Sequence, residues 1–117
     1  MSAASRSVYY FGFYLLATGL ALIVSPNTLL SLVGIAPTGE VWIRVLGSVV
    51  TAVGLYYVLM APSNHTLFLT LTVYIRASIF VWFVVFAVLS IAPMQLILFG
   101  VVDLVGAGWT LMALRKG

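Results

Sequence analysis

One arginine and one aspartate lie near the middle of two long apolar segments, where charged side chains are rare. Arg76 and Asp103 each follow the start of their segment by about ten residues, so both would lie roughly 15 Å deep in a pair of antiparallel membrane helices. A lone charge at this depth costs about 2.5–3.5 kcal/mol on insertion scales, and such residues commonly mark a functional site. We therefore predict that Arg76 and Asp103 face each other, either as an ion pair that fixes helix register or as part of a ligand-binding pocket.

A second arginine, Arg44, extends the predicted site toward one membrane surface. Its helical face carries further polar residues, so a polar track would run from that surface down to the depth of Asp103. Alternatively, the Arg44 side chain snorkels outward to the surface, one turn from Glu40. The residues that we predict to bind a ligand are Arg44, Arg76, Asp103, Glu40, Ser48, Thr51, Thr18 and Tyr14.

The chemistry of these residues predicts a small amphipathic ligand. A guanidinium fork matches carboxylate and phosphate groups, so the ligand would have an anionic or hydrogen-bonding head on a lipid-like body. A neutral lipid-like molecule is the alternative. Small residues on the same faces, such as Gly47, Gly100 and Gly106, are interpreted as positions where helices pack together.

The composition of the chain predicts the elements that position this site. Of the 117 residues, 64% are hydrophobic and 6% are charged, whereas soluble domains have about 25% charged residues. We therefore predict an integral membrane protein, whose length corresponds to a single domain, 1–117. Four apolar segments approach the roughly 20 residues that a membrane span needs, and every proline lies in a connection between them. The predicted spans are 8–25, 39–61, 67–90 and 93–114.

The connections between the spans predict their arrangement. Tight connections make neighbours antiparallel, which indicates an all-α fold, an up-down bundle of four transmembrane helices. Residues 27–36 of the longer first connection are apolar but too few to cross a membrane, so we expect a short helix at the interface. Thr38 is then expected to cap the second span, with Glu40 in its first turn, where the helix dipole favours an anion.

The charged residues also predict the topology. The net charge of +3 comes from Arg6, Arg115 and Lys116 at the ends of the chain, because the inner charges sum to zero. Segments rich in Lys and Arg stay in the cytoplasm, so both termini are predicted to be cytoplasmic. The expected partners are membrane lipids, with a homo-oligomer or a membrane complex as further options. The net positive charge arises from very few charged residues and does not indicate a surface that binds nucleic acid.

Signals for catalysis are weak in this sequence. There is no cysteine, and the only histidine, His65, is expected in a surface loop far from Asp103 along the bundle axis. The sequence has no cluster of metal ligands and no phosphate-binding glycine loop, so no catalytic residue, metal or cofactor is predicted. An isomerase-type reaction with Asp103 as proton acceptor stays open, although Arg76 would favour the charged carboxylate. The sequence also allows proton-coupled transport through Asp103 in an oligomer, and an accessory role in a membrane complex.

Two short motifs resemble a known family. The segment IRVLG at 43–47 is similar to the Arg-x-x-Gly signature of small bacterial membrane proteins related to the DoxX-like group. Arg76 on the third span, and Asp103 in the segment VVDLVG at 101–106, match an arginine and an acid of that group. The resemblance covers residues 40–114 and implies a four-helix bundle in a bacterial inner membrane. It departs at Asp103, where the group more often has a longer acid, and it implies no particular chemistry.

Overall fold

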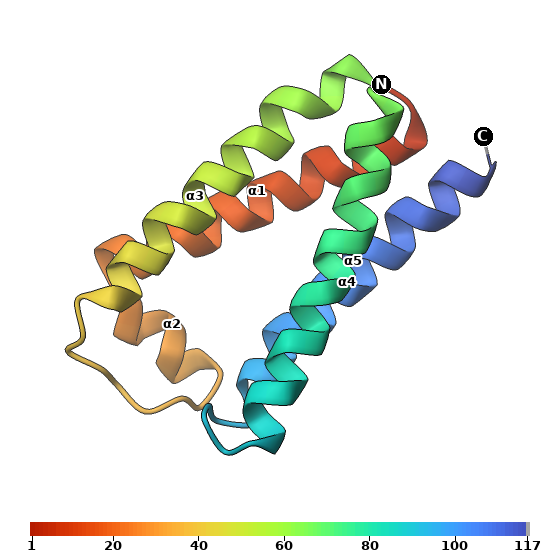
Figure 1. The fold of residues 1–117 in the computed structure, drawn as a ribbon. Helices are drawn as coiled ribbons and strands as arrows, with labels where there is room; N and C mark the ends of the chain where they lie inside the picture. The colour runs from red at the N-terminus through yellow and green to blue at the C-terminus, as the bar shows by residue number, and fades with distance from the viewer. Residues whose placement is uncertain (117) are drawn as a thin grey trace. The chain divides into compact units, whose positions relative to one another are not determined.

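The structure of the protein is a computed structural model that describes residues 1–116. Over these residues it is all-helical (Figure 1). In chain order the helices are α1 (Ala3–Val24), α2 (Pro26–Leu32), α3 (Trp42–Met60), the short 3-10 helix η1 (Ala61–Ser63), α4 (Thr66–Val88) and α5 (Leu96–Lys116). Four segments are long and apolar enough to cross a membrane: α1, α3 together with η1, α4 and α5. The prediction of an all-α membrane protein with four transmembrane helices is confirmed.

The prolines mark helix ends, as the sequence predicts. Pro26 occupies the first turn of α2, where a missing N–H removes no helical hydrogen bond. Pro62 lies in η1, whereas Pro37 and Pro93 lie outside the helices. The short helix α2 confirms the helix that was expected between the first two spans.

The linker between α2 and α3 corrects one expectation. The N–H of Thr38 donates to Oδ1 of Asn27 at 2.9 Å, and the Asn27 amide donates to the Thr38 carbonyl at 3.2 Å. The Thr38 hydroxyl accepts the N–H of Glu40 at 3.1 Å. These local bonds hold the backbone in a turn, so α3 begins only at Trp42. The predictions that Thr38 caps this helix and that Glu40 lies in its first turn are therefore wrong.

The chain divides into two compact units. One unit comprises Tyr9–Leu59, and the other comprises Met1–Val8 and Met60–Gly117. The first unit contains most of α1 and α3, together with α2. The second contains α4, α5 and the first turns of α1. The single domain expected for residues 1–117 stays a prediction.

Four glycines form the contact between α1 and α3 in the Tyr9–Leu59 unit. Gly12 and Gly19 are seven residues apart on α1, as are Gly47 and Gly54 on α3. A Cβ atom added at Gly12 would lie 3.1 Å from the carbonyl oxygen of Gly54, and one added at Gly54 would lie 3.0 Å from that of Gly12. Gly19 and Gly47 have the same reciprocal relationship, at 2.9 and 2.8 Å. The helices thus meet backbone to backbone in antiparallel directions, which confirms the packing role of Gly47.

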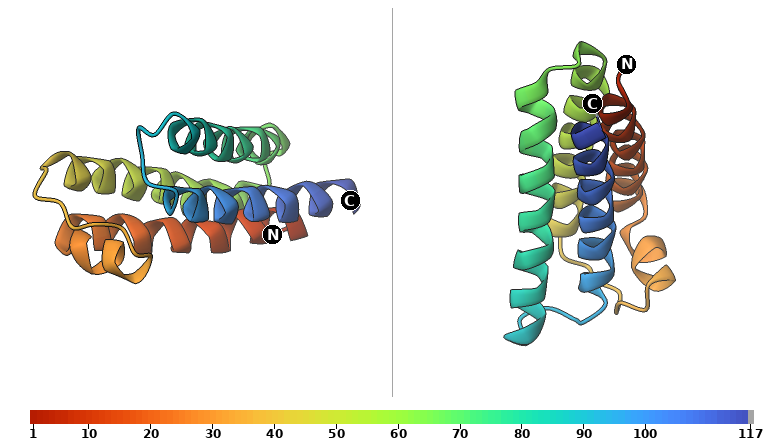
Figure 2. Two further views of the ribbon diagram at one scale, coloured as in Figure 1. Left: turned by 90° about the horizontal axis from the view of Figure 1, so that it is seen from below. Right: turned by 90° about the vertical axis from the view of Figure 1, so that its right-hand side faces the viewer.

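In the other unit, α4 and α5 lie side by side and run in opposite directions (Figure 2). Gly100 of α5 faces α4, because a Cβ added there would lie 3.2 Å from the Cα of Phe80. Its predicted packing role is confirmed. At the opposite end of this pair, Leu69 of α4 is buried, as are Ala4 and Val8 in the first turns of α1. These three helices therefore surround one core, and Arg76 lies in it.

The helices α2 and α4 end in similar backbone turns with different residues at the left-handed position. After α2 this residue is Gly34, with a φ of 76°. After α4 it is Ser90, with a φ of 60°, and the next residue, Ile91, donates its N–H to the Phe86 carbonyl at 2.9 Å. This hydrogen bond defines a Schellman motif, which glycine adopts without the steric cost that a Cβ atom brings.

Candidate functional site

Arg76 lies in the core formed by α4, α5 and the start of α1, although its side chain is charged. The residue is 2% exposed. Its Nε donates to the carbonyl oxygen of Thr72 at 3.0 Å, and its Nη2 donates to the hydroxyls of Thr72 at 3.1 Å and Thr110 at 2.7 Å. Thr72 precedes Arg76 by one turn of α4, whereas Thr110 belongs to α5. The guanidinium therefore joins the two helices by charge-assisted hydrogen bonds.

The hydrogen bonds continue from Thr110 to the first turns of α1, and the donor of each bond can be assigned. Ser7 Oγ donates its single proton to the Ala4 carbonyl at 2.7 Å. The 2.6 Å contact between Ser7 and Thr110 must therefore be donated by Thr110, which in turn accepts from Arg76. Both hydroxyl residues are fully buried. A single chain of donors thus runs from the guanidinium to α1.

A second branch stays on α4, where the Thr72 hydroxyl donates to the carbonyl oxygen of Leu69 at 2.7 Å. A network of buried hydrogen bonds that starts from an ionised donor, here the Arg76 guanidinium, holds the groups that it joins in one arrangement. We call this set the Arg76 network, and its members are Arg76, Thr72, Thr110 and Ser7. It fixes the axial positions of α4, α5 and the start of α1 relative to one another.

Asp103, the predicted partner of Arg76, lies two turns before Thr110 on α5 and is half-buried. Its carboxylate interacts with Arg76 through charge, while the guanidinium donates its hydrogen bonds to Thr72 and Thr110. Side chains on a helix lean toward the N-terminus of that helix. Because α4 and α5 are antiparallel, this rule would turn Arg76 and Asp103 toward opposite ends of the pair. The direct ion pair between them stays a prediction.

Arg44 holds the end of α1 in the Tyr9–Leu59 unit. Its Nη1 donates to the carbonyl oxygen of Ile23 and, at 3.5 Å, to that of Val24, the last residue of α1. Carbonyls in the last turn have no partner within their own helix, and the negative end of the helix dipole favours a cation. The exposed Arg44 therefore caps α1. Glu40 is exposed in the linker before α3.

Two of the remaining predicted ligand-binding residues of that unit, Ser48 and Thr51, use their hydroxyls within their own helix. Ser48 and Thr51 donate their hydroxyls to carbonyls of their own helix, at 2.7 and 2.8 Å. The ring of Tyr14 packs against that of Phe11, with 5.2 Å between the centroids, and Thr18 is half-buried. Hydroxyls that bond to their own helix need no further acceptor. A single pocket that joins all the predicted residues stays a prediction.

A second polar cluster, which the sequence analysis does not single out, ties the start of α1 to the turn before α4. Asn64 has a left-handed φ of 53°, a conformation that asparagine adopts more readily than most residues. Its Oδ1 accepts hydrogen bonds from the N–H of Ser2, at 3.0 Å, and from the hydroxyl of Ser5. Ser2 Oγ accepts the N–H of Ser5 at 3.0 Å and so caps α1. A serine cap and a turn asparagine are recognisable in the sequence, but nothing there connects them.

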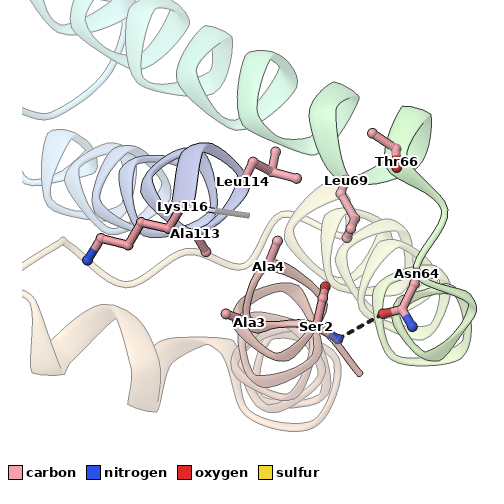
Figure 3. A pocket seen from close by; sticks show the side chains of 9 residues that line it. All are labelled: Ser2, Ala3, Ala4, Asn64, Thr66, Leu69, Ala113, Leu114 and Lys116. Atoms are coloured by element: carbon pink, nitrogen blue, oxygen red, sulfur yellow. Dashed lines mark hydrogen bonds between the residues drawn. The ribbon is translucent and has the colours of Figure 1, made fainter.

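A hollow of about 630 Å³ lies beside this cluster, between the start of α1, the start of α4 and the end of α5 (Figure 3). Pockets for small molecules usually measure about 300–1,000 Å³. Leu69, Ala113 and Leu114 give it an apolar wall, and Asn64 and Lys116 stand on opposite sides of it. We call it the terminal hollow. None of the residues that the sequence predicts to bind a ligand lines it.

The Arg76 network ends at the wall of the terminal hollow. Ala4 and Leu69, whose carbonyls accept the last hydrogen bonds of its two branches, both line the hollow. The buried arginine thus holds in place the helices that form this wall. Arg76 is a positioning residue for the hollow, not one of its lining residues.

Across residues 1–116 no group of three or more His, Cys, Asp or Glu side chains is placed to hold a metal ion. His65 accepts the N–H of Phe68 at Nδ1, 3.4 Å away, and so caps the start of α4. The residues that line the terminal hollow offer hydrogen-bond donors and apolar surface for binding.

Comparison with family models, with curated proteins and with solved structures finds no match for the chain. Its resemblance to the DoxX-like group, and the bacterial inner membrane that this resemblance implies, stay predictions.

Proposed function

We propose that this membrane protein binds a small amphipathic, lipid-like molecule in the terminal hollow. The observation that supports the proposal is the mixed lining of the hollow. Leu69, Ala113 and Leu114 provide apolar surface, while Asn64 and Lys116 provide polar groups at its sides. A ligand with an apolar body and a polar head would place its body against the apolar residues and its head beside the polar ones. Small-molecule pockets commonly combine apolar walls with a few polar groups in this way.

The position of the hollow suits such a ligand. It lies where α5 ends and α4 begins, and both helices are long and apolar enough to cross a membrane. The ends of such helices lie near the polar headgroup region, so an amphiphile would meet the hollow from within one leaflet. By the positive-inside rule this leaflet would be the cytoplasmic one.

The test is the recovery of a bound amphiphile from protein extracted in a mild detergent, measured by mass spectrometry of the organic extract. We expect roughly one molecule of a single chemical class per chain from the unaltered protein. Ala113→Trp should abolish this recovery by filling the hollow. Met112→Trp is the matched control, because Met112 is the preceding residue on α5, is 60% exposed and does not line the hollow. Equal recovery from both variants, or none from the unaltered protein, would contradict the proposal.

A second candidate function is proton-coupled transport, and Asp103 is the observation that favours it. It is half-buried in the middle of α5, and the other acidic residue of the chain, Glu40, lies outside the helices. A carboxylate within a membrane helix is a common proton carrier. Reconstituted vesicles would show this function as a proton flux, driven by an amphiphile gradient, that is lost in Asp103→Asn. Flux that is unchanged in Asp103→Asn would exclude this residue as the carrier.

A further inference from the structure

We propose that the molecule held in the terminal hollow is an anionic phospholipid, whose phosphate is bound beside Lys116. This inference rests on the proposed function and names the class of ligand. Lys116 is exposed at the end of α5 and is one of the residues that line the hollow. In the view of Figure 3 its ammonium group points away from the other lining residues, so binding a phosphate requires its flexible side chain to turn toward the hollow. Its ammonium group is a compact cation with three donors, which suits a phosphate oxygen.

Two further basic residues belong to the helix ends that border the hollow. Arg6 is exposed on the first turns of α1, and Arg115 is exposed next to Lys116. The one acidic residue of this unit is Asp103, thirteen residues before Lys116 on α5 and thus roughly 20 Å away along the helix. An anion in the hollow would therefore lie far from the Asp103 carboxylate. Each basic residue near an anionic lipid surface strengthens such an attraction about fivefold.

The hydrogen-bonding groups at the hollow favour an anion as well. Ala3 and Ala4 belong to the first turn of α1, and Thr66 opens α4, so the positive ends of two helix dipoles border the cavity. The Thr66 hydroxyl is a further donor on the same wall. These groups add to Lys116 and do not replace it.

The apolar wall favours a lipid over a free phosphate ion. Leu69, Ala113 and Leu114 offer no partner to an inorganic ion, but they suit the start of an acyl chain that enters from the bilayer. The phosphates of a bilayer lie at the ends of transmembrane helices, and anionic lipids are enriched in the cytoplasmic leaflet. Charge, depth and lining thus agree on an anionic phospholipid.

The test compares phosphatidylglycerol with phosphatidylcholine of identical acyl chains, added to the full-length protein in detergent and measured as bound lipid by native mass spectrometry. We expect at least a fivefold preference for phosphatidylglycerol, which Lys116→Gln should lower about fivefold. Arg115→Gln is the matched control, since it removes the same charge from the adjacent residue, which does not line the hollow. Lys116→Arg should retain the preference.

Each of the other possible outcomes contradicts one part of the proposal. Equal binding of the two lipids would refute the anionic ligand and leave the proposed function standing, whereas binding of neither lipid would refute both. An equal loss in Lys116→Gln and Arg115→Gln would show diffuse attraction to a basic surface and no site. Displacement of phosphatidylglycerol by inorganic phosphate at millimolar concentration would show that the phosphate alone is recognised, contrary to a lipid site.

Discussion

Arg76 Nη2 lies 2.7 Å from the Thr110 hydroxyl, and this hydrogen bond joins the middle of one membrane-spanning helix to another. Thr110 passes its own proton to Ser7, so the same bond links α4 and α5 to the start of α1. The cost of a buried charge is thereby reduced by oriented hydroxyl groups. The stability of this unit and the shape of the terminal hollow should both depend on it.

Replacing Thr110 by valine removes the hydroxyl while keeping the shape of the side chain. We expect the free energy of unfolding to fall by about 1–3 kcal/mol, because Arg76 and Ser7 each lose a buried partner. Reversible unfolding in mixed micelles with a rising fraction of SDS would measure this change. Thr110→Ser is the control, since it keeps the hydroxyl and should cost less than Thr110→Val. The reverse order of the two variants would show that packing of the methyl group dominates.

A double-mutant cycle can decide which residue is the main partner of Arg76. We expect Arg76→Met and Thr110→Val to couple by about 0.5–3 kcal/mol, because the two side chains are in direct contact. The parallel cycle of Arg76→Met with Asp103→Asn should give a smaller coupling energy, since Arg76 donates hydrogen bonds to Thr72 and Thr110. Unfolding free energies of the single and double variants supply both values. A larger coupling with Asp103 would make the aspartate the main partner of Arg76, as the sequence predicts.

The contact between α1 and α3 should tolerate no side chain at its glycines. A Cβ atom at Gly19 would lie 2.6 Å from the Thr51 nitrogen and 2.9 Å from the Gly47 oxygen, so Gly19→Ala must push two backbones apart. We expect a loss of about 1–3 kcal/mol in the free energy of unfolding. Gly108→Ala is the matched control, because nothing lies within 4 Å of the added atom. It should be neutral or raise stability by up to about 1 kcal/mol, as alanine favours a helix. Equal effects of the two substitutions would argue against the backbone contact.

Glycine in place of Ser90 should stabilise the protein. Ser90 has a φ of 60° at the end of α4, where a Cβ atom is sterically unfavourable. We expect Ser90→Gly to raise the free energy of unfolding by about 0.5–1 kcal/mol, seen as a higher midpoint in thermal unfolding. Ser78→Gly makes the same change at an exposed position inside α4 and should lower stability by a similar amount. A lower midpoint for Ser90→Gly would mean that the serine side chain stabilises the folded protein by more than the steric cost of its left-handed backbone.

Part of the candidate site was predictable from residue types and depth. A buried charge in a membrane helix needs partners, so Arg76 stands out in the sequence, and it does lie in a core. Arg44 was also notable, but its hydrogen bonds go to the end of α1, a role that no spacing along α3 reveals. The terminal hollow was not predictable, because Ser2, Asn64 and Lys116 are far apart in the sequence and ordinary in type.

The sequence by itself determined the four long helices, since apolar segments in lipid must satisfy their backbone hydrogen bonds internally and prolines end them. It also determined which helical faces carry glycine. Only the tertiary structure decided that Gly12 meets Gly54 and that the Arg76 guanidinium donates a hydrogen bond to Thr110. The physical reason is that such partners depend on the axial register of two helices and on the lean of each side chain toward its own N-terminus. Neither quantity is contained in the spacing of residues along one chain segment.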